Sequence, residues 1–292
     1  MTDTITIPSR PRGFRPATTE PTVVKLALIA LCLAVLTVLL FAPLIAVFDE
    51  ALRRGWAFAL ASLSEPDAQS AIRLTLTVAA IVVPLNAAFG IAAAWAITKF
   101  DWRGKAWVIT LIDLPFSVSP VVAGLLFVLM FGANSALGSW LVANGFSIVF
   151  AVPGIILATL FITFPFVARE LIPVMLEQGR AEEEAALTLG ASGWRTFLTV
   201  TLPNIRWALL YGVLLCNARA MGEFGAVAVV SGKIRGQTTT MPLMIEMFYN
   251  EYLSVAAFTI AALLALLAFV TLALKSALEW RYADQLAATH RH

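Results

Sequence analysis

The chain has 292 residues, of which 60% are hydrophobic and only 13% are charged, a charged share well below that of an ordinary soluble domain. This composition indicates an integral membrane protein, and a net charge of +2 is too small to favour nucleic-acid binding. The two cysteines, Cys32 and Cys216, both lie in apolar runs, so we expect small hydrophobic side chains and no disulfide framework.

The first apolar run follows a polar N-terminal stretch and is too long for the core of a cleaved signal peptide. We therefore expect a cytoplasmic tail over residues 1–22 and a retained first helix. Between Lys25 and Asp49 lie 23 uncharged residues, enough to cross a hydrocarbon core of ~30 Å at ~1.5 Å per residue. A second run of 25 uncharged residues lies between Arg73 and Lys99.

The next uncharged run, residues 114–168, has 55 residues and is too long for one helix. Its turn-forming stretch FGANSALGSW (131–140) divides it into a third span that ends near Phe131 and a fourth over 152–168. A fifth span is expected over 207–230 and a sixth between Glu251 and Lys275. We predict an all-α membrane domain of six helices over 23–275, followed by a cytoplasmic C-terminal tail over 276–292.

The distribution of lysine and arginine predicts the orientation of these spans. With the N-terminus inside, 14 of the 20 basic residues face the cytoplasm and five face outward, while Arg219 falls within the fifth span. The asymmetry predicts that both termini are cytoplasmic. The outward five are Arg53, Arg54, Arg73, Lys233 and Arg235.

The third span opens with DLPFSVSPVVAGL, in which two prolines and two serines should break or kink a helix. Two interpretations stay open. The kink can serve packing alone, or Ser117 and Ser119 can belong to a polar turn that lines a pathway, since irregular backbone is tolerated in a membrane only against protein or water.

A polar stretch, EEEAALTLGASGWRTFLTVTLP (182–203), interrupts the apolar sequence on the predicted cytoplasmic side. We expect a short helix over 174–189 with Gly179 as a weak point inside it, then a stop at Gly190 and a second short helix capped by Ser192. The adjacent glutamates 182–184 form a wet face. They argue against a helix lying on anionic lipid, so a groove on a protein partner is the better hypothesis.

Within this stretch a spaced pattern resembles the EAA loop of ABC-importer permeases. The matching residues are Glu184, Ala185, Ala186, Gly190, Leu202 and Pro203, with Val200 in place of the family's isoleucine. The segments LPFSVSPVVAGL and NARAMGEFGAVAVVSGKIRGQTTTMPL are similar to the oxyanion branch of these permeases, most of all to the W-type subunit of sulfate/thiosulfate importers. This resemblance extends over about residues 74–281.

The resemblance implies a type I importer fold in the bacterial inner membrane, with residues 170–206 as the cytoplasmic coupling loop that docks on an ATPase subunit. It implies a second, T-type permease subunit, two ATPase subunits and an external sulfate- or thiosulfate-binding protein as partners. No phosphate-binding loop motif occurs in the chain, so ATP and Mg are expected on the ATPase partner and no cofactor here. His290 and His292 lack clustered ligands, so no metal site is expected.

Charges inside a membrane span indicate function by default. Arg219 and Glu223 are four residues apart, which predicts one helix face for both. They can be a neutral pair that orders the helices, or Arg219 with Asn217 can line the anion path while Glu223 restrains Arg219. Asp113 is a second candidate partner for Arg219.

The leading hypothesis is therefore the permease subunit of a sulfate or thiosulfate importer, a transport chain without a catalytic site. A molybdate or tungstate permease, which would pair with itself, is the nearest alternative, because that branch shares the Gly-Glu-Phe-Gly-Ala type of motif. A secondary transporter driven by an ion gradient would leave the EAA-like loop unexplained.

Overall fold

The computed structural model describes residues 21–289, without the side chains of residues 275 and 278–289. Almost all of the expected N-terminal tail (1–22) lies outside the described residues, as do His290 and His292. The chain divides into two units, Met1–Ala46 and Val47–His292. The first helix, α1 (Thr22–Leu52), begins in the first unit and ends in the second. All other elements belong to the second unit.

Every regular element in residues 21–289 is helical, which confirms the all-α class. Five helical stretches are long and apolar enough to cross a membrane, or six if one bent pair counts as a span. The five are α1, α3 (Pro66–Lys99), α7 (Val152–Gln178), the stretch Gly193–Met221 and the first part of α13 (Ser254–Thr289). Shorter helices connect them: α2 (Trp56–Ser64), α6 (Ala136–Ala143) and α12 (Met241–Asn250).

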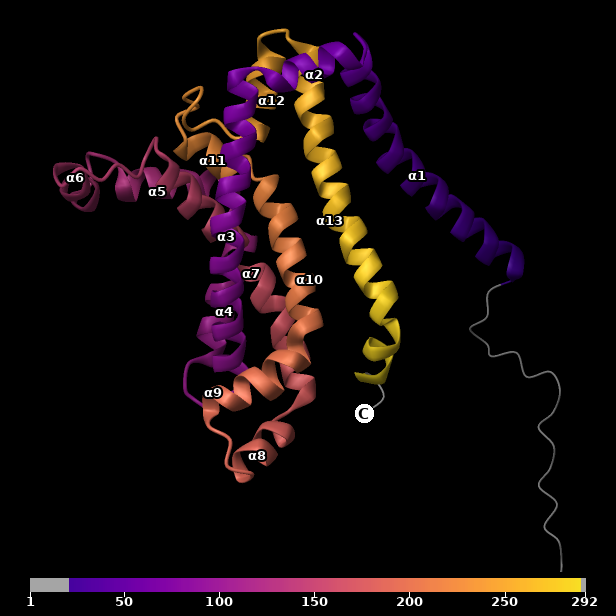
Figure 1. The fold of residues 1–292 in the computed structure, drawn as a ribbon, viewed down its shortest axis with the longest axis vertical. Helices are drawn as coiled ribbons and strands as arrows, with labels where there is room; N and C mark the ends of the chain where they lie inside the picture. The colour runs from indigo at the N-terminus through magenta and orange to yellow at the C-terminus, as the bar shows by residue number, and fades with distance from the viewer. Residues whose placement is uncertain (1–20, 290–292) are drawn as a thin grey trace, which may run out of the picture. The chain divides into compact units, whose positions relative to one another are not determined.

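The bent pair consists of α4 (Lys105–Ser117) and α5 (Pro120–Phe131), between which the chain bends by 107°. Val118 between them has extended backbone angles, and Pro120 opens α5 at a position where its missing N–H costs no helical hydrogen bond. The predicted break in the third span is thus confirmed. In Figure 1, α5 and α6 project away from the bundle that α3, α7 and α10 (Leu202–Met221) form.

Close approach of α3, α7 and α10 builds the core of the second unit. Gly90 of α3 and Gly212 of α10 both lie against Val167 of α7, where added Cβ atoms would come within 2.6 Å and 3.1 Å of Val167 atoms. Small residues let membrane helices approach closely, since lipid supplies little hydrophobic force between them. Asn86 is completely buried in this core and donates to Thr163 Oγ1 at 2.8 Å and to Cys216 Sγ at 3.5 Å.

The predicted single helix over 207–230 is wrong. Helix α10 ends at Met221, residues 222–224 are not helical, and α11 (Gly225–Val230) starts afresh. The glycines on either side of Glu223 weaken helix propensity, so the chain can turn there. Gly225 contacts the start of α5, because a Cβ at Gly225 would lie 2.9 Å from Pro120 Cβ. The α10–α11 break (222–224) therefore lies near the α4–α5 break (118–119).

The polar stretch forms an elbow over residues 179–201. Gly179 does not lie inside a helix as predicted: with φ of 68° it ends α7, and α8 (Ala181–Thr188) follows. Gly190 has φ of 86°, the left-handed turn predicted there. Ser192 caps α9 (Gly193–Thr196), as predicted, by accepting the N–H of Arg195. A π-helical segment (Phe197–Thr201) then joins α9 to α10 without a gap.

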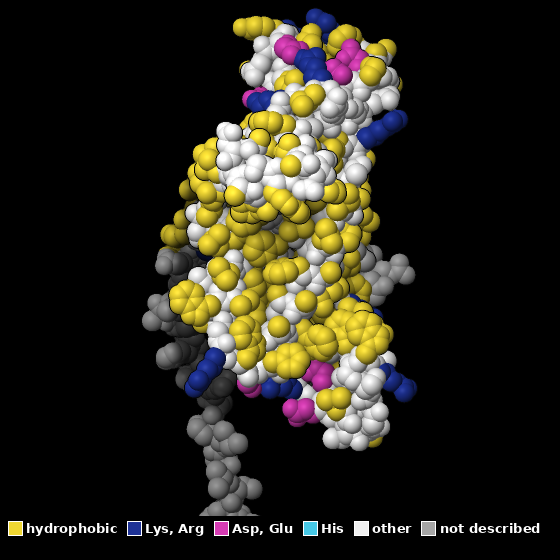
Figure 2. Space-filling model, turned by 90° about the vertical axis from the view of Figure 1, so that its left-hand side faces the viewer, with side chains coloured by type: hydrophobic (Ala, Val, Ile, Leu, Met, Phe, Trp, Pro, Cys, Tyr) yellow, Lys and Arg dark blue, Asp and Glu magenta, His cyan; other side chains and the backbone are white. Residues whose placement is uncertain are grey.

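Hydrophobic and charged side chains separate along the second unit. Figure 2 shows a face whose middle is covered by hydrophobic side chains, with lysine, arginine and carboxylates gathered toward the two ends. One end carries the elbow, and the other carries Arg235 with Asp67 and Glu251, and Lys233 with Glu246. Helix α13 continues past residue 275 to Thr289, so the boundary drawn for the C-terminal tail is not a helix end.

Candidate functional site

Arg219 and Glu223 form a close ion pair, although not on one helix face as predicted. Arg219 lies in the last turn of α10, while Glu223 belongs to the break that follows. Arg219 Nη1 is 2.7 Å from Glu223 Oε2, and Glu223 Oε1 accepts the backbone N–H of Ala226 at 3.0 Å. The Glu223 side chain is 1% exposed and that of Arg219 is 34% exposed. The guanidinium of Arg219 is therefore partly accessible from the protein surface, whereas the carboxylate of Glu223 is not.

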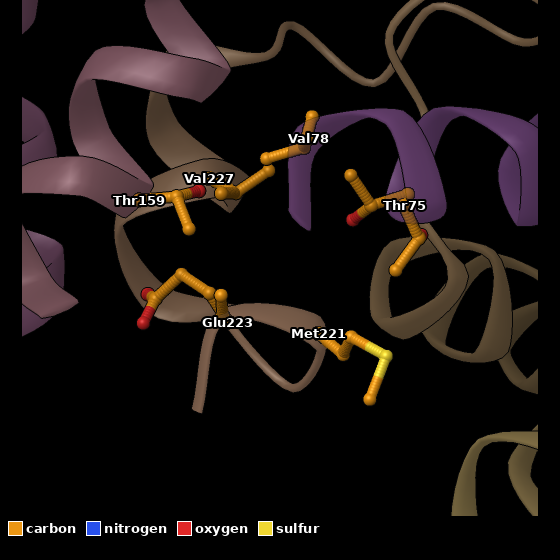
Figure 3. Close-up of a pocket in the computed structure, with 8 residues that line it drawn as sticks. Thr75, Val78, Thr159, Met221, Glu223 and Val227 are labelled. Carbon is orange, nitrogen blue, oxygen red and sulfur yellow. The ribbon is translucent and has the colours of Figure 1, made fainter. Parts of the chain in front are cut away.

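Glu223 also lines a small pocket at the junction of α3, α7, α10, α11 and α12. Figure 3 shows Thr159 and Glu223 on one side of it and Thr75 on the other. Thr75 Oγ1 accepts the N–H of Met241 at 2.8 Å, which connects α3 to the start of α12. The buried hydroxyls of Thr159 and Thr240 make no hydrogen bond to the described residues. The pocket thus combines three threonines and a carboxylate with apolar side chains, and it lies where five helices meet.

The other predicted pathway residues are only partly brought together. Ser117 ends α4 and Ser119 precedes α5, and both are exposed at the α4–α5 break. Asn217 is half-buried in α10, two residues before Arg219, a spacing that puts the two side chains on different faces of the helix. Its place beside Arg219 in an anion path stays a prediction.

Asp113 is not a partner of Arg219, contrary to the alternative drawn from the sequence. It pairs with Arg169 of α7, whose Nε is 3.4 Å from Asp113 Oδ1. The Arg169 guanidinium also lies over the ring of Phe116, 5.0 Å from its centre. Asp113 therefore finds its cation through the contact between α4 and α7, because Arg169 is 56 positions away in the sequence but close in the fold.

The elbow exposes the residues of the EAA-like pattern. Glu184 and Ala185 are exposed and Ala186 is half-buried in α8, while Leu202 and Pro203 form the first turn of α10. Large apolar side chains stand out beside Gly190: Leu189 is 89% exposed and Trp194 is 67% exposed. A carboxylate beside exposed apolar side chains on a short, well-defined turn has the character of a protein-docking surface.

The glutamates of α8 do not form one wet face. Glu182 accepts a hydrogen bond from Asn204 Nδ2, and Glu183 is bonded to Lys99 and Thr201. The loop between α3 and α4 adds Asp101. The pKa of Asp101 is held below its ordinary value by its hydrogen bond to Lys105 and by the charge of Arg180. The elbow is therefore connected by side chains both to the end of α3 and to the start of α10.

Reasoning from the sequence missed two of these polar clusters. The Asn86 cluster had a visible signal, because an asparagine inside an apolar span requires a partner. Lys99 had a weaker one: it marked the end of a span, but nothing in the sequence paired it with Glu183, 84 positions away.

Comparison with known proteins places these features in a family. A family profile described as "Binding-protein-dependent transport system inner membrane component" matches residues 86–283. The chain belongs to this family. The matched region includes the elbow and both helix breaks.

Individual relatives agree. The chain is 53% identical over 261 residues to "Sulfate transport system permease protein CysW" of Escherichia coli K12, covering 89% of this chain and 90% of that one. It is 54% identical to the CysW protein of Synechocystis sp., covering 88% and 94%. The CysT permease of Escherichia coli K12 is 35% identical, covering 77% and 82%.

A solved structure shares the fold. A bacterial alginate ABC transporter, in complex with an alginate pentasaccharide-bound periplasmic protein, aligns with a TM-score of 0.72 at 17% identity, covering 89% of this chain and 96% of that one. At this identity the likeness concerns the fold alone.

Proposed function

We propose that this chain is a permease subunit of an ATP-driven ABC importer for sulfate or thiosulfate, and that it forms one half of the translocation pathway. The observation that carries the proposal is the 53% identity to CysW along nine tenths of both chains. At this similarity the substrate class is expected to be shared. A molybdate or tungstate permease is less well supported, because the relatives compared above are sulfate permeases.

The elbow supports a coupling role. Glu184 and the apolar Leu189 and Trp194 are displayed on a turn fixed by Gly190 and Ser192, which suits a groove on a folded partner better than a lipid surface. In this proposal the elbow faces the cytoplasm and docks on one of two ATPase subunits, which bind ATP and Mg. Both termini are then cytoplasmic in a multi-pass inner-membrane protein with six spans.

The two helix breaks support a place for the anion. Interrupted helices leave backbone groups and polar side chains at membrane depth, where transporters hold their substrates. Arg219 supplies a cation that is one third exposed there, while Glu223 neutralises most of its charge. Such a site attracts a dianion weakly, and weak binding favours passage over retention.

The remaining partners follow from the same assignment. The similarity to both CysW and CysT suggests a heterodimer with a CysT-like permease, and an external sulfate- or thiosulfate-binding protein delivers the anion. A homodimer is the alternative assembly, and it is the one expected of a molybdate-type permease.

The test is to co-express the chain with its expected partners and purify the assembly in mild detergent. The chains that co-purify identify the assembly, and uptake of sulfate, thiosulfate and molybdate into proteoliposomes identifies the substrate. Uptake of sulfate or thiosulfate that requires ATP is expected. Uptake of molybdate alone, or sulfate uptake that follows an ion gradient without ATP, would refute the proposal.

Docking is tested separately with Glu184→Lys, which should reduce recovery of the ATPase subunit. Glu65→Lys is the matched control, since Glu65 is also exposed and forms no side-chain cap at the start of α3, at the end of the unit away from the elbow. Equal ATPase recovery in both variants would contradict the docking role.

A further inference from the structure

Lys99, the last residue of α3, is unusual among the basic residues near the elbow because it is almost buried. Its side chain is 8% exposed, and Nζ lies 2.7 Å from Glu183 Oε2. The same ammonium donates to the carbonyl of Gly179, which directly follows α7. Exposed ion pairs contribute little to stability, whereas separating a pair that is shielded from water is costly, because each charge is then left without a partner.

Glu183 has a second connection. Its Oε1 accepts the hydroxyl of Thr201 at 2.8 Å, and Thr201 is the buried last residue of the π-helical segment that leads into α10. One carboxylate of α8 is therefore bonded to the end of α3 through Lys99 and to the start of α10 through Thr201. Glu183 faces inward, whereas its neighbour Glu184 is exposed.

The two helices that Glu183 joins continue to the pocket lined by Glu223. Helix α3 contributes Thr75 to the pocket, and α10 contributes Met221 and ends beside Glu223. In Figure 1, α3 and α10 run from the region of α8 and α9 toward α11 and α12. A displacement of α8 that kept these bonds would move both helix ends together.

We propose that Lys99, Glu183 and Thr201 form a joint that passes displacement of α8 to α3 and α10 at once. The three are positioning residues: they do not touch the ATPase or the anion. The inference rests on the proposed function, and it assigns to Glu183 a task different from docking. Without the joint, the ATPase would still bind and hydrolyse ATP, but the path would open less often per ATP.

The experiment measures sulfate uptake and ATP hydrolysis in parallel, in proteoliposomes that contain the whole importer with its binding protein. Lys99→Gln and Glu183→Gln each remove the ion pair. Lys105→Gln is the matched control, because it removes a lysine ion pair with Asp101 (2.9 Å) at the same end, while Asp101 keeps its ion pair with Arg180 (3.2 Å), the residue before α8. Thr201→Val keeps the ion pair and removes only the hydroxyl donor, and Thr201→Ser restores that donor.

We expect sulfate transported per ATP to fall about tenfold in Lys99→Gln and Glu183→Gln, while ATP hydrolysis per recovered complex stays near the wild-type value. Thr201→Val should show a smaller fall, which Thr201→Ser reverses, and Lys105→Gln should show none. An unchanged ratio, or uptake and hydrolysis that fall in proportion, would overturn the joint.

If the two ion-pair variants are not recovered, Thr201→Val decides: a wild-type ratio in that variant overturns the proposal. A wild-type importer that takes up no sulfate would instead refute the proposed function, because that measurement does not involve the joint.

Discussion

Replacing Arg219 by methionine should destabilise the protein more than replacing Glu223 by glutamine, although both changes break the same ion pair. The reason is the unequal burial of the two groups. Loss of Arg219 leaves a carboxylate that is 1% exposed without its cation. Loss of the Glu223 charge leaves a guanidinium that is 34% exposed and can be partly hydrated.

The magnitudes follow from these surroundings. An uncompensated buried charge costs about 3–5 kcal/mol, which is the expected loss for Arg219→Met. In Glu223→Gln the amide oxygen can still accept the N–H of Ala226, so about 1–2 kcal/mol is expected. A difference of about 2 kcal/mol corresponds to about 4–8 °C in the midpoint of thermal unfolding for a chain of this size.

The assay is thermal unfolding of the purified importer in detergent, with subunit recovery as a second measure of folding. The double variant Arg219→Met with Glu223→Leu separates architecture from transport. It should recover the stability lost in Arg219→Met, because no charge is left unpaired. It should nevertheless fail to take up sulfate, because the positive potential that offsets desolvation of the dianion is gone.

Two results would refute this reasoning. If Glu223→Gln unfolds at a lower temperature than Arg219→Met, the burial asymmetry does not control stability. If the double variant takes up sulfate at the wild-type rate, Arg219 only orders the helices and has no part in the anion path.

The other predictions concern orientation, the elbow and helix contact. A cysteine at Ser192 should react only with reagents on the cytoplasmic side and one at Ser64 only with reagents outside; the reverse pattern would exclude docking on an ATPase. Gly190→Pro should abolish uptake while the spans still insert, because proline cannot adopt the φ of 86°; normal uptake would exclude the turn as a coupling element. Gly124→Leu should destabilise the protein by about 1–3 kcal/mol and so reduce its recovery, because even a Cβ there would lie 2.7 Å from the Ala226 carbonyl oxygen. Gly222→Ala, whose Cβ meets nothing nearer than 3.5 Å, should be recovered normally, and equal recovery of both variants would contradict this account.

The uninterrupted apolar runs made α1, α3, α7 and the first part of α13 predictable, because length and charge suffice to recognise such spans. The Pro120 break and the Gly190 turn were also predictable, since each depends on the backbone limits of one residue type. The short helices α2, α6 and α12 were not predicted. Yet α6 carries a start signal of its own, because Ser135 caps it by accepting the N–H of Gly138.

Errors in the candidate site have one physical origin. The spacing of Arg219 and Glu223 suggested a common helix face, but the helix ends at Met221 and Gly222, so the ion pair joins the last turn of α10 to the break that follows. The partners of Asp113 and Glu183 were likewise set by contacts between distant segments. Spacing along a chain predicts contacts within an element, whereas contacts between elements depend on how those elements pack.

The buried asparagine of α3 has a consequence for biosynthesis. The hydrogen-bond partners of Asn86 lie 77 and 130 residues further along the chain, in α7 and α10. During membrane insertion α3 therefore emerges with an amide that has no partner, and a polar group in lipid favours any site that keeps it solvated. We infer that α3 stays beside the insertion machinery or a water-filled cavity until α10 has been synthesised, so that the three helices leave for the bilayer as one packed group.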